Sequence, residues 1–162
     1  MSAAGGTYAL LLTLEKDYLV EVGRLGSLHF QPGHYIYVGR ARRRLFSRIK
    51  AHLHLHQRPH WHIDYLRQRA GVTGLWWALT PEPQECLWSQ AVLSLPGALV
   101  PRPRFGASDC RCLTHLVYFN TAPSPSLFRR HLAKLGGQVP VHVWAEKELA
   151  EQMEYTRECR GR

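Results

Sequence analysis

Carboxylates are scarce in this sequence, and one long stretch has none. Between Glu21 and Asp64 no aspartate or glutamate occurs, although that stretch holds eight lysines and arginines and seven of the ten histidines. The whole chain of 162 residues has 21 Lys and Arg but only 12 Asp and Glu, a formal net charge of +9. This imbalance favours a polyanionic partner, either nucleic acid or an anionic membrane. A solvated basic helix would also carry a charge run, but a gap of this length favours polyanion binding.

Long apolar runs are absent as well. The run Tyr8–Leu12 suits a strand and is far too short to span a membrane, and the N-terminus lacks a basic segment followed by an apolar one. The four cysteines are unevenly spaced, which argues against the disulfide framework of a small secreted protein. We therefore expect a cytoplasmic protein with reduced thiols and no membrane partner.

The apolar content is nevertheless that of a folded domain, at 45% with five tryptophans. The periodicity predicts an α/β (α+β) fold with a short antiparallel sheet flanked by helices over residues 1–120. A linker-like segment then begins a C-terminal extension, residues 121–162. Expected strands cover 7–14, 18–23, 33–39, 72–80, 114–120 and 139–144, with a hairpin turn at Lys16 and Asp17. Expected helices cover 42–55, 62–70, 84–95, 128–135 and 145–157.

The order of strand, glycine and basic helix around Gly39 indicates a phosphate site. A turn at Gly39 followed by a helix would present free backbone N–H groups and the positive end of the helix dipole. Tyr35 and Tyr37 share one side of the strand, and Arg48 can reach back over the sheet with a guanidinium suited to phosphate oxygens. The residues expected to contact nucleic acid are Arg40, Arg42, Arg43, Arg44 and Lys50.

Several segments carry a family resemblance. The triplets Gly6-Thr7-Tyr8 and Tyr37-Val38-Gly39, with Arg48 four residues before His52, resemble the motifs of the GIY-YIG nuclease superfamily. The segments HWHIDYL (60–66), EC (85–86) and FGASDCRCLTHLVY (105–118) are similar to an uncharacterised branch of that superfamily, sometimes fused to endonuclease III-type glycosylases. The resemblance covers residues 6–120.

The resemblance implies a metal-dependent endonuclease that cleaves DNA rather than RNA in repair or processing, with a DNA-repair glycosylase as a possible partner. It implies that Tyr8 activates or orients the attacking water and that Tyr37 bonds the phosphate or the water. Arg48 would stabilise the charge developing on the phosphoryl oxygens, and His52 would carry a proton or contact the phosphate. One Mg²⁺ or Mn²⁺ would be held by an acidic residue of the later helix.

The expected metal ligand departs from the superfamily pattern. The register of ECLWSQAVL places Gln90 where the ligand should be, and a neutral amide is a poor sole ligand for a hard dication. We therefore expect Glu85 to hold the metal. The alternative is a nucleic-acid-binding accessory module with a degraded nuclease site; a small-ligand phosphate-binding domain is a third, less favoured reading.

A second constellation consists of Cys86, Cys110, Cys112 and His115. Four such ligands would complete a tetrahedral structural zinc site if the fold brings them together. The alternative is a set of buried free thiols beside a hydrogen-bonded histidine.

Several of these residues could instead have purely structural roles. Tyr8 and Tyr37 could be core aromatics, Arg48 a surface charge, and Trp76 and Trp77 packing residues rather than a base-stacking platform. The pattern His60-x-His62-x-Asp64 could bind metal, but we favour a hydrogen-bonded helix N-terminus.

Overall fold

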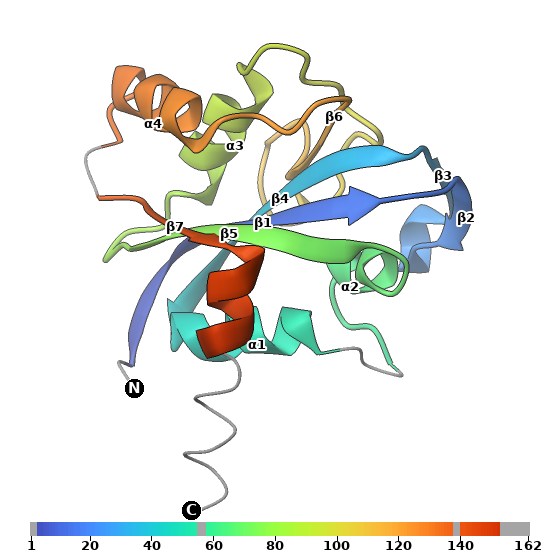
Figure 1. Ribbon diagram of the computed structural model, residues 1–162, viewed down its shortest axis with the longest axis horizontal. Coiled ribbons are helices and arrows are strands. Elements are labelled where there is room, and N and C mark those ends of the chain that lie inside the picture. Colours follow the sequence, from blue (N-terminus) through green and yellow to red (C-terminus); the bar gives the residue numbers. More distant parts are fainter. Residues whose placement is uncertain (1–2, 55–57, 138–139, 153–162) are drawn as a thin grey trace, which may run out of the picture.

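The computed structural model describes residues 3–54, 58–137 and 140–152. Its centre is a five-stranded sheet in the order β6-β4-β1-β5-β7, in which every neighbouring pair is antiparallel (Figure 1). The strands are β1 (Ala4–Leu14), β4 (Gly33–Arg43), β5 (Gly71–Leu79), β6 (Leu116–Phe119) and β7 (His142–Ala145). The expected α+β class with a helix-flanked antiparallel sheet is confirmed.

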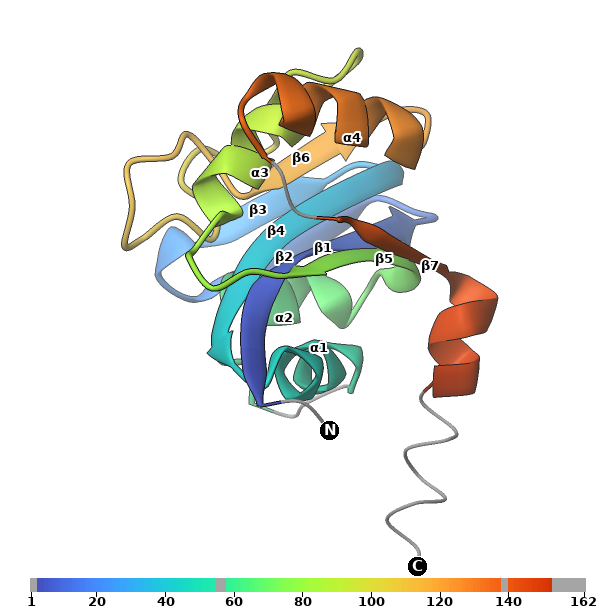
Figure 2. The same ribbon diagram turned by 90° about the vertical axis from the view of Figure 1, so that its left-hand side faces the viewer.

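Helices cover both faces of this sheet. Helices α3 (Glu85–Leu93) and α4 (Pro125–Lys134) lie on one face, and α1 (Leu45–Leu53) and α2 (His62–Arg67) lie on the other (Figure 2). Alternation along β4 divides the core accordingly, because successive side chains of a strand point to opposite faces. Ile36 and Val38 join the apolar cluster with α3 and α4, whereas Tyr35 and Tyr37 join the cluster with α1 and α2.

Strand β4 is longer than the sequence indicated, and the predicted turn at Gly39 is wrong. Gly39 pairs with Tyr8 inside the β1–β4 ladder, and the strand continues to Arg43. A glycine is needed here because a Cβ atom would lie 2.5 Å from the Tyr8 hydroxyl oxygen. Helix α1 begins only at Leu45, so its N-terminus does not follow a glycine turn as expected.

The predicted hairpin at Lys16 and Asp17 is also wrong. Strand β2 (Tyr18–Glu21) does not return along β1 but pairs with β3 (Ser27–Phe30), a strand that the sequence analysis did not predict. The short 3₁₀ turn η1 (Gly23–Leu25) joins them, with Gly23 and Gly26 in the positive-φ region that favours glycine. The resulting two-stranded ribbon contributes Val20 and Phe30 to the core beside α2.

The C-terminal residues add to the sheet. Strand β7 pairs with β5, with Leu75 opposite Trp144, and residues 146–152 form a helical segment whose Leu149 is buried in the α1 and α2 cluster. Trp76 and Trp77 pack on opposite faces of β5, Trp76 against Phe128. The end of the expected helix 145–157 and the start of the expected strand at 139 lie outside the described residues. Among the described helices, none has the length and apolar character needed to cross a bilayer.

Candidate functional site

A cleft of about 850 Å³ opens where β1, β4 and the starts of α1, α2 and α3 meet the loop before β6. Its wall is rich in charge and in ring systems. The side chains that give it this character are Tyr8, Tyr37, Arg40, Arg42, Arg43, Arg48, His60, Trp61, His62, Glu85, Asp109 and His115. The fold therefore brings together Tyr8, Tyr37 and Arg48 from three separate elements.

A chain of hydrogen bonds leads inward from Tyr8. The Tyr8 hydroxyl oxygen lies 2.6 Å from His52 Nε2, and His52 Nδ1 lies 3.1 Å from Asp64 Oδ1. Both His52 and Asp64 are buried. The other carboxylate oxygen of Asp64 accepts the backbone N–H groups of His60 and Trp61, at 3.0 and 2.9 Å. The expected hydrogen-bonded helix N-terminus at His60–Asp64 is thus present, and His52 lies behind Tyr8 rather than on the cleft wall.

The ionisable groups of this chain have shifted pKa values. Burial raises the pKa of Tyr8 well above its usual value, although the nearby Arg48 guanidinium opposes that shift. Burial likewise raises the pKa of Tyr37. Burial alone would raise the pKa of Asp64 too, but hydrogen bonds from His52, Trp61 and His60 hold it below its usual value. At neutral pH both tyrosines are therefore neutral phenols and Asp64 is a carboxylate.

Arg48 lies in the first turn of α1, earlier in the helix than the sequence indicated. Its guanidinium carbon is 4.5 Å from the centre of the Trp61 ring, and its Nη1 donates to the Arg40 carbonyl oxygen at 3.2 Å. Stacking and a backbone acceptor together restrict the guanidinium, which lines the cleft within hydrogen-bonding reach of the Tyr8 hydroxyl.

Glu85 is the cleft carboxylate best suited to bind a metal ion. One of its oxygens pairs with Arg40 Nε at 3.3 Å. The other oxygen, Oε2, is buried and has no hydrogen-bond partner among the described residues. Gln90, the residue in the superfamily register, is exposed and does not line the cleft.

The expected nucleic-acid contacts divide into two groups. Arg40, Arg42 and Arg43 line the cleft, because β4 carries them past the end of the predicted strand. Arg44 and Lys50 are not part of the cleft wall. Arg44 instead caps α1 in a left-handed conformation with φ of 53°.

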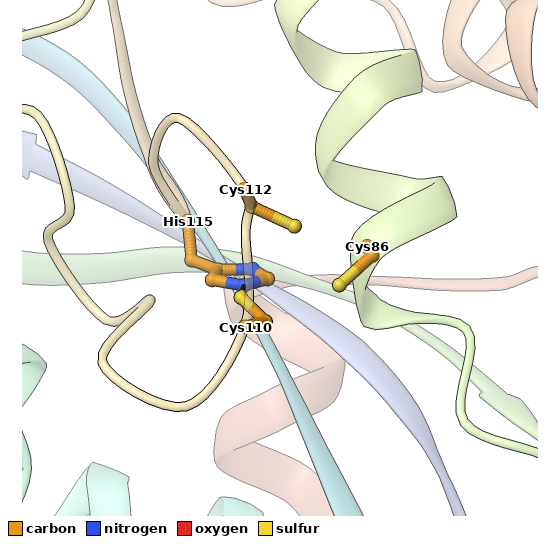
Figure 3. A group of neighbouring side chains, drawn as sticks. All are labelled: Cys86, Cys110, Cys112 and His115. Carbon is orange, nitrogen blue, oxygen red and sulfur yellow. Dashed lines mark hydrogen bonds between the residues drawn. The ribbon is translucent and has the colours of Figure 1, made fainter.

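The Cys₃His cluster is the second site. Cys86 projects from the first turn of α3, and Cys110, Cys112 and His115 come from the loop opposite (Figure 3). One ligand atom of each residue lies within 4.8 Å of the others. Donors around one zinc ion at about 2.3 Å are separated by about 3.8 Å, so a small contraction would complete a tetrahedral site. The four residues together could bind a metal ion.

The surroundings of the cluster suit a metal. Ser89 Oγ lies 2.6 Å from His115 Nδ1, which leaves Nε2, 3.1 Å from Cys110 Sγ, directed at the thiols. Metal-binding histidines commonly have such a partner on the second ring nitrogen. Burial raises the pKa of the Cys86 and Cys112 thiols, so without a cation these groups stay protonated.

The loop that carries Cys110, Cys112 and His115 is held in place by hydrogen bonds at two points. The Arg104 guanidinium donates to the carbonyl oxygens of Cys110 and Cys112. The Gly106 N–H donates to His62 Nδ1 at 3.0 Å, which joins the loop to the start of α2. These bonds hold the loop in place, and its Asp109 forms part of the cleft wall.

Two residues of these sites were not predicted as functional. Asp64 was considered only as part of a metal pattern or a helix cap, and an acidic residue at the third helical position signals only the cap. Ser89 is 26 residues from His115 in the sequence, and no local pattern links them.

Comparison with known proteins identifies one family. The family model described as "Domain of unknown function DUF123" matches residues 7–136. No curated protein and no solved structure matches the chain. DUF123 is distinct from the GIY-YIG nucleases, so the membership of that superfamily suggested by the sequence motifs is wrong. The expected glycosylase partner depended on that resemblance and loses its basis.

Proposed function

The chain belongs to the DUF123 family, and from its own cleft we propose that it is a divalent-metal-dependent phosphodiester hydrolase acting on nucleic acid, with DNA as the first substrate to test. The observation that carries the proposal is the convergence of Tyr8, Arg48 and Glu85 on one basic cleft. Hydrolysis of a phosphodiester needs cationic donors for the phosphoryl oxygens, a group that orients water, and a carboxylate that can hold a cation.

Each of these requirements has a candidate in the cleft. Arg48 is held by Trp61 and by the Arg40 carbonyl, so it can donate to phosphoryl oxygens without first being ordered. Tyr37 supplies a neutral hydroxyl that can bond the phosphate. Tyr8 supplies a second hydroxyl, already bonded to His52, that can accept a proton from water.

The donor set fits one hard divalent ion. Glu85 Oε2 is a buried carboxylate oxygen without a partner among the described side chains, and Asp109 lines the same cleft. Mg²⁺ and Mn²⁺ are bound by one or two carboxylates with several waters, so Glu85, assisted by Asp109, would hold the ion. When bound, the ion neutralises charge on the phosphate and lowers the pKa of a coordinated water.

For the Cys₃His cluster we propose zinc in a structural role. Three thiols and an imidazole are the donors of closed tetrahedral zinc sites, and the four residues leave no ligand position open. The Ser89 hydroxyl beside His115 Nδ1 supports this assignment, because it fixes the ring with Nε2 toward the thiols.

Nicking of supercoiled plasmid DNA in Mg²⁺ or Mn²⁺ tests the proposed hydrolase. We expect cleavage by the wild type and a loss of roughly 10²–10⁴-fold in rate for Arg48→Ala, because a preorganised donor to the phosphoryl group is removed. Binding should weaken far less, since Arg40, Arg42 and Arg43 remain.

Arg24→Ala is the matched control, because Arg24 is an exposed arginine on the β2–β3 turn that does not line the cleft. If Arg48→Ala lowered binding and cleavage equally, Arg48 would only contact the nucleic-acid backbone and would have no role in the chemical step. Salt-sensitive binding by the wild type without cleavage on duplex, flapped, branched and RNA substrates would favour a binding module instead.

A further inference from the structure

Asp64 does not line the cleft, and its two carboxylate oxygens have different hydrogen-bond partners. Oδ2 accepts both backbone N–H groups at the start of α2, from His60 and Trp61. The bond from Trp61 is one half of a capping box, because Trp61 is the N-cap residue of α2 and Asp64 is its third helical residue. Oδ1 is not needed for the cap and lies 3.1 Å from His52 Nδ1 instead. Asp64 therefore connects the start of α2 to the buried imidazole of His52.

The neighbours of His52 restrict its protonation. Asp64 and Tyr8 lie at its two ring nitrogens, the Tyr37 and Trp61 rings pack edge-on against it, and Arg48 precedes it by one helical turn. A carboxylate oxygen can only accept, so Nδ1 must carry a proton. A neutral imidazole then has a lone pair at Nε2, and the Tyr8 phenol must donate to it.

We propose that Asp64 is a positioning residue that fixes His52 as the Nδ1–H tautomer, so that His52 Nε2 draws the phenol proton of Tyr8 and makes the Tyr8 oxygen a base for the attacking water. This inference rests on the proposed hydrolase function. It makes His52, behind the cleft, the final proton acceptor, which the water proton reaches by way of Tyr8 on the cleft wall.

Two protons move when one water molecule attacks. An O–H bond of the water breaks as its oxygen attacks phosphorus, and that proton moves to the Tyr8 oxygen. The original phenol proton moves at the same time to His52 Nε2, so Tyr8 ends neutral and His52 becomes an imidazolium. The Asp64 carboxylate stabilises that cation through the Nδ1–H bond. The bond between phosphorus and the leaving oxygen breaks on the opposite side, where that oxygen takes a proton from solvent, and the imidazolium later releases its proton through Tyr8 to water.

The ring tautomer of His52 can be measured without any activity. Long-range ¹H–¹⁵N NMR of the imidazole nitrogens in the full-length wild type at neutral pH should show Nδ1 protonated and Nε2 unprotonated. Asp64→Asn should invert this assignment. The amide oxygen can keep the bonds to His60 and Trp61, whereas the amide NH₂ then faces Nδ1 and requires a lone pair there.

Plasmid cleavage supplies the second measurement. Asp64→Asn should lower kcat by roughly 10²–10⁴-fold with little change in KM, because DNA still meets the same arginines. Asp17→Asn is the matched control, since Asp17 also contacts a histidine, His29, but at an exposed site away from the cleft wall. The control should alter neither the His52 tautomer nor the cleavage rate.

The outcomes separate this inference from the proposed function. A wild-type His52 with Nε2 protonated, alone or together with Nδ1, overturns the inference even if Asp64→Asn fails to fold. An inverted tautomer with unchanged kcat overturns it as well. A wild type with the expected tautomer and no cleavage supports the positioning by Asp64 but refutes the hydrolase.

Discussion

At the scale of single residues, chain neighbours serve different sites. Glu85 lines the cleft, and Cys86, next to it at the start of α3, belongs to the Cys₃His cluster. Asp109 and Cys110 repeat the arrangement in the loop before β6. Because each pair shares a peptide bond, the position of both cleft carboxylates depends on the geometry of the cluster.

The Glu85 carboxylate gives the sharpest single-residue prediction. Glu85→Gln keeps the size of the side chain but removes the charge that a dication requires, so metal-dependent nicking should fall by at least about 10²-fold. Gln90→Ala, an exposed position of the same helix, is the matched control and should change the rate little. Higher activity in Gln90→Glu than in the wild type, with Glu85→Gln unaffected, would move the metal position to residue 90.

The sequence predicted many of these residues but not how they are connected. Tyr37 and Arg48 could be selected from the order of strand, glycine and basic helix, whereas Tyr8 and Glu85 were selected through the family resemblance. The structure places all four on the cleft. The bond between His52 and Asp64 joins helices α1 and α2, and nothing in the local sequence pattern specifies such a pairing. The family assignment was wrong because short motifs with small and aromatic residues are not unique to one family.

At the scale of elements, β4 decides where the basic residues lie. The sequence pattern predicts that this strand ends at Gly39, because glycine commonly marks a turn, and that a helix begins at Arg42. Pairing with β1 along ten positions overrides that local signal and extends the strand to Arg43. Arg40 and Arg42 consequently lie on an extended strand beside the cleft rather than on a helix.

Close packing of β1 on β4 predicts the effect of a methyl group at Gly39. Gly39→Ala should destabilise the fold by about 1–3 kcal/mol, since the new Cβ would lie 2.5 Å from the Tyr8 hydroxyl oxygen. Gly71→Ala in β5 is the control, because nothing lies within 4 Å of its Cβ position. Urea unfolding of the two variants measures the difference; equal stabilities would mean that the Tyr8 ring shifts at no cost.

The loop from Pro101 to Leu113 lacks regular structure, and its order should depend on the metal. We expect about one zinc ion per purified chain, and Cys112→Ser should lower both the zinc content and Tm because folding and metal binding are coupled. Cys159→Ser is the control, because it leaves Cys86, Cys110, Cys112 and His115 unchanged. Metal-free protein with a Tm indifferent to chelator would support the alternative of buried free thiols.

At the scale of the whole molecule, the excess positive charge is concentrated at the end of β4. Arg42 and Arg43 are exposed at the cleft, and Arg44 follows them at the start of α1. Helix α4 carries further basic residues, but it covers the opposite face of the sheet (Figure 2). A nucleic acid in the cleft would therefore meet the first group and not the second.

This distribution predicts a salt-dependent affinity for DNA. Changing Arg42, Arg43 and Arg44 together to Ser should weaken binding for all sequences alike and reduce the slope of log Kobs against log salt by about 0.9 for each phosphate that the variant no longer neutralises. The control changes three exposed basic residues elsewhere, Arg24, Arg130 and Lys134, to Ser. Fluorescence anisotropy at several salt concentrations measures both, and an affinity independent of salt would contradict polyanion binding.

Strand β7 has a consequence for any shortened form of this protein. The family match ends at residue 136, yet β7, at residues 142–145, forms the outer edge of the sheet against β5. A chain cut at the family boundary would leave unpaired those backbone N–H and C=O groups of Gly74–Trp77 that face β7, whereas the groups that face β1 would keep their partners. Strand β5 has nine residues and β7 has four, so β7 replaces a long edge strand by a short one. A short edge strand is a poorer template for strands of another molecule, so β7 lowers the tendency to self-associate and aggregate.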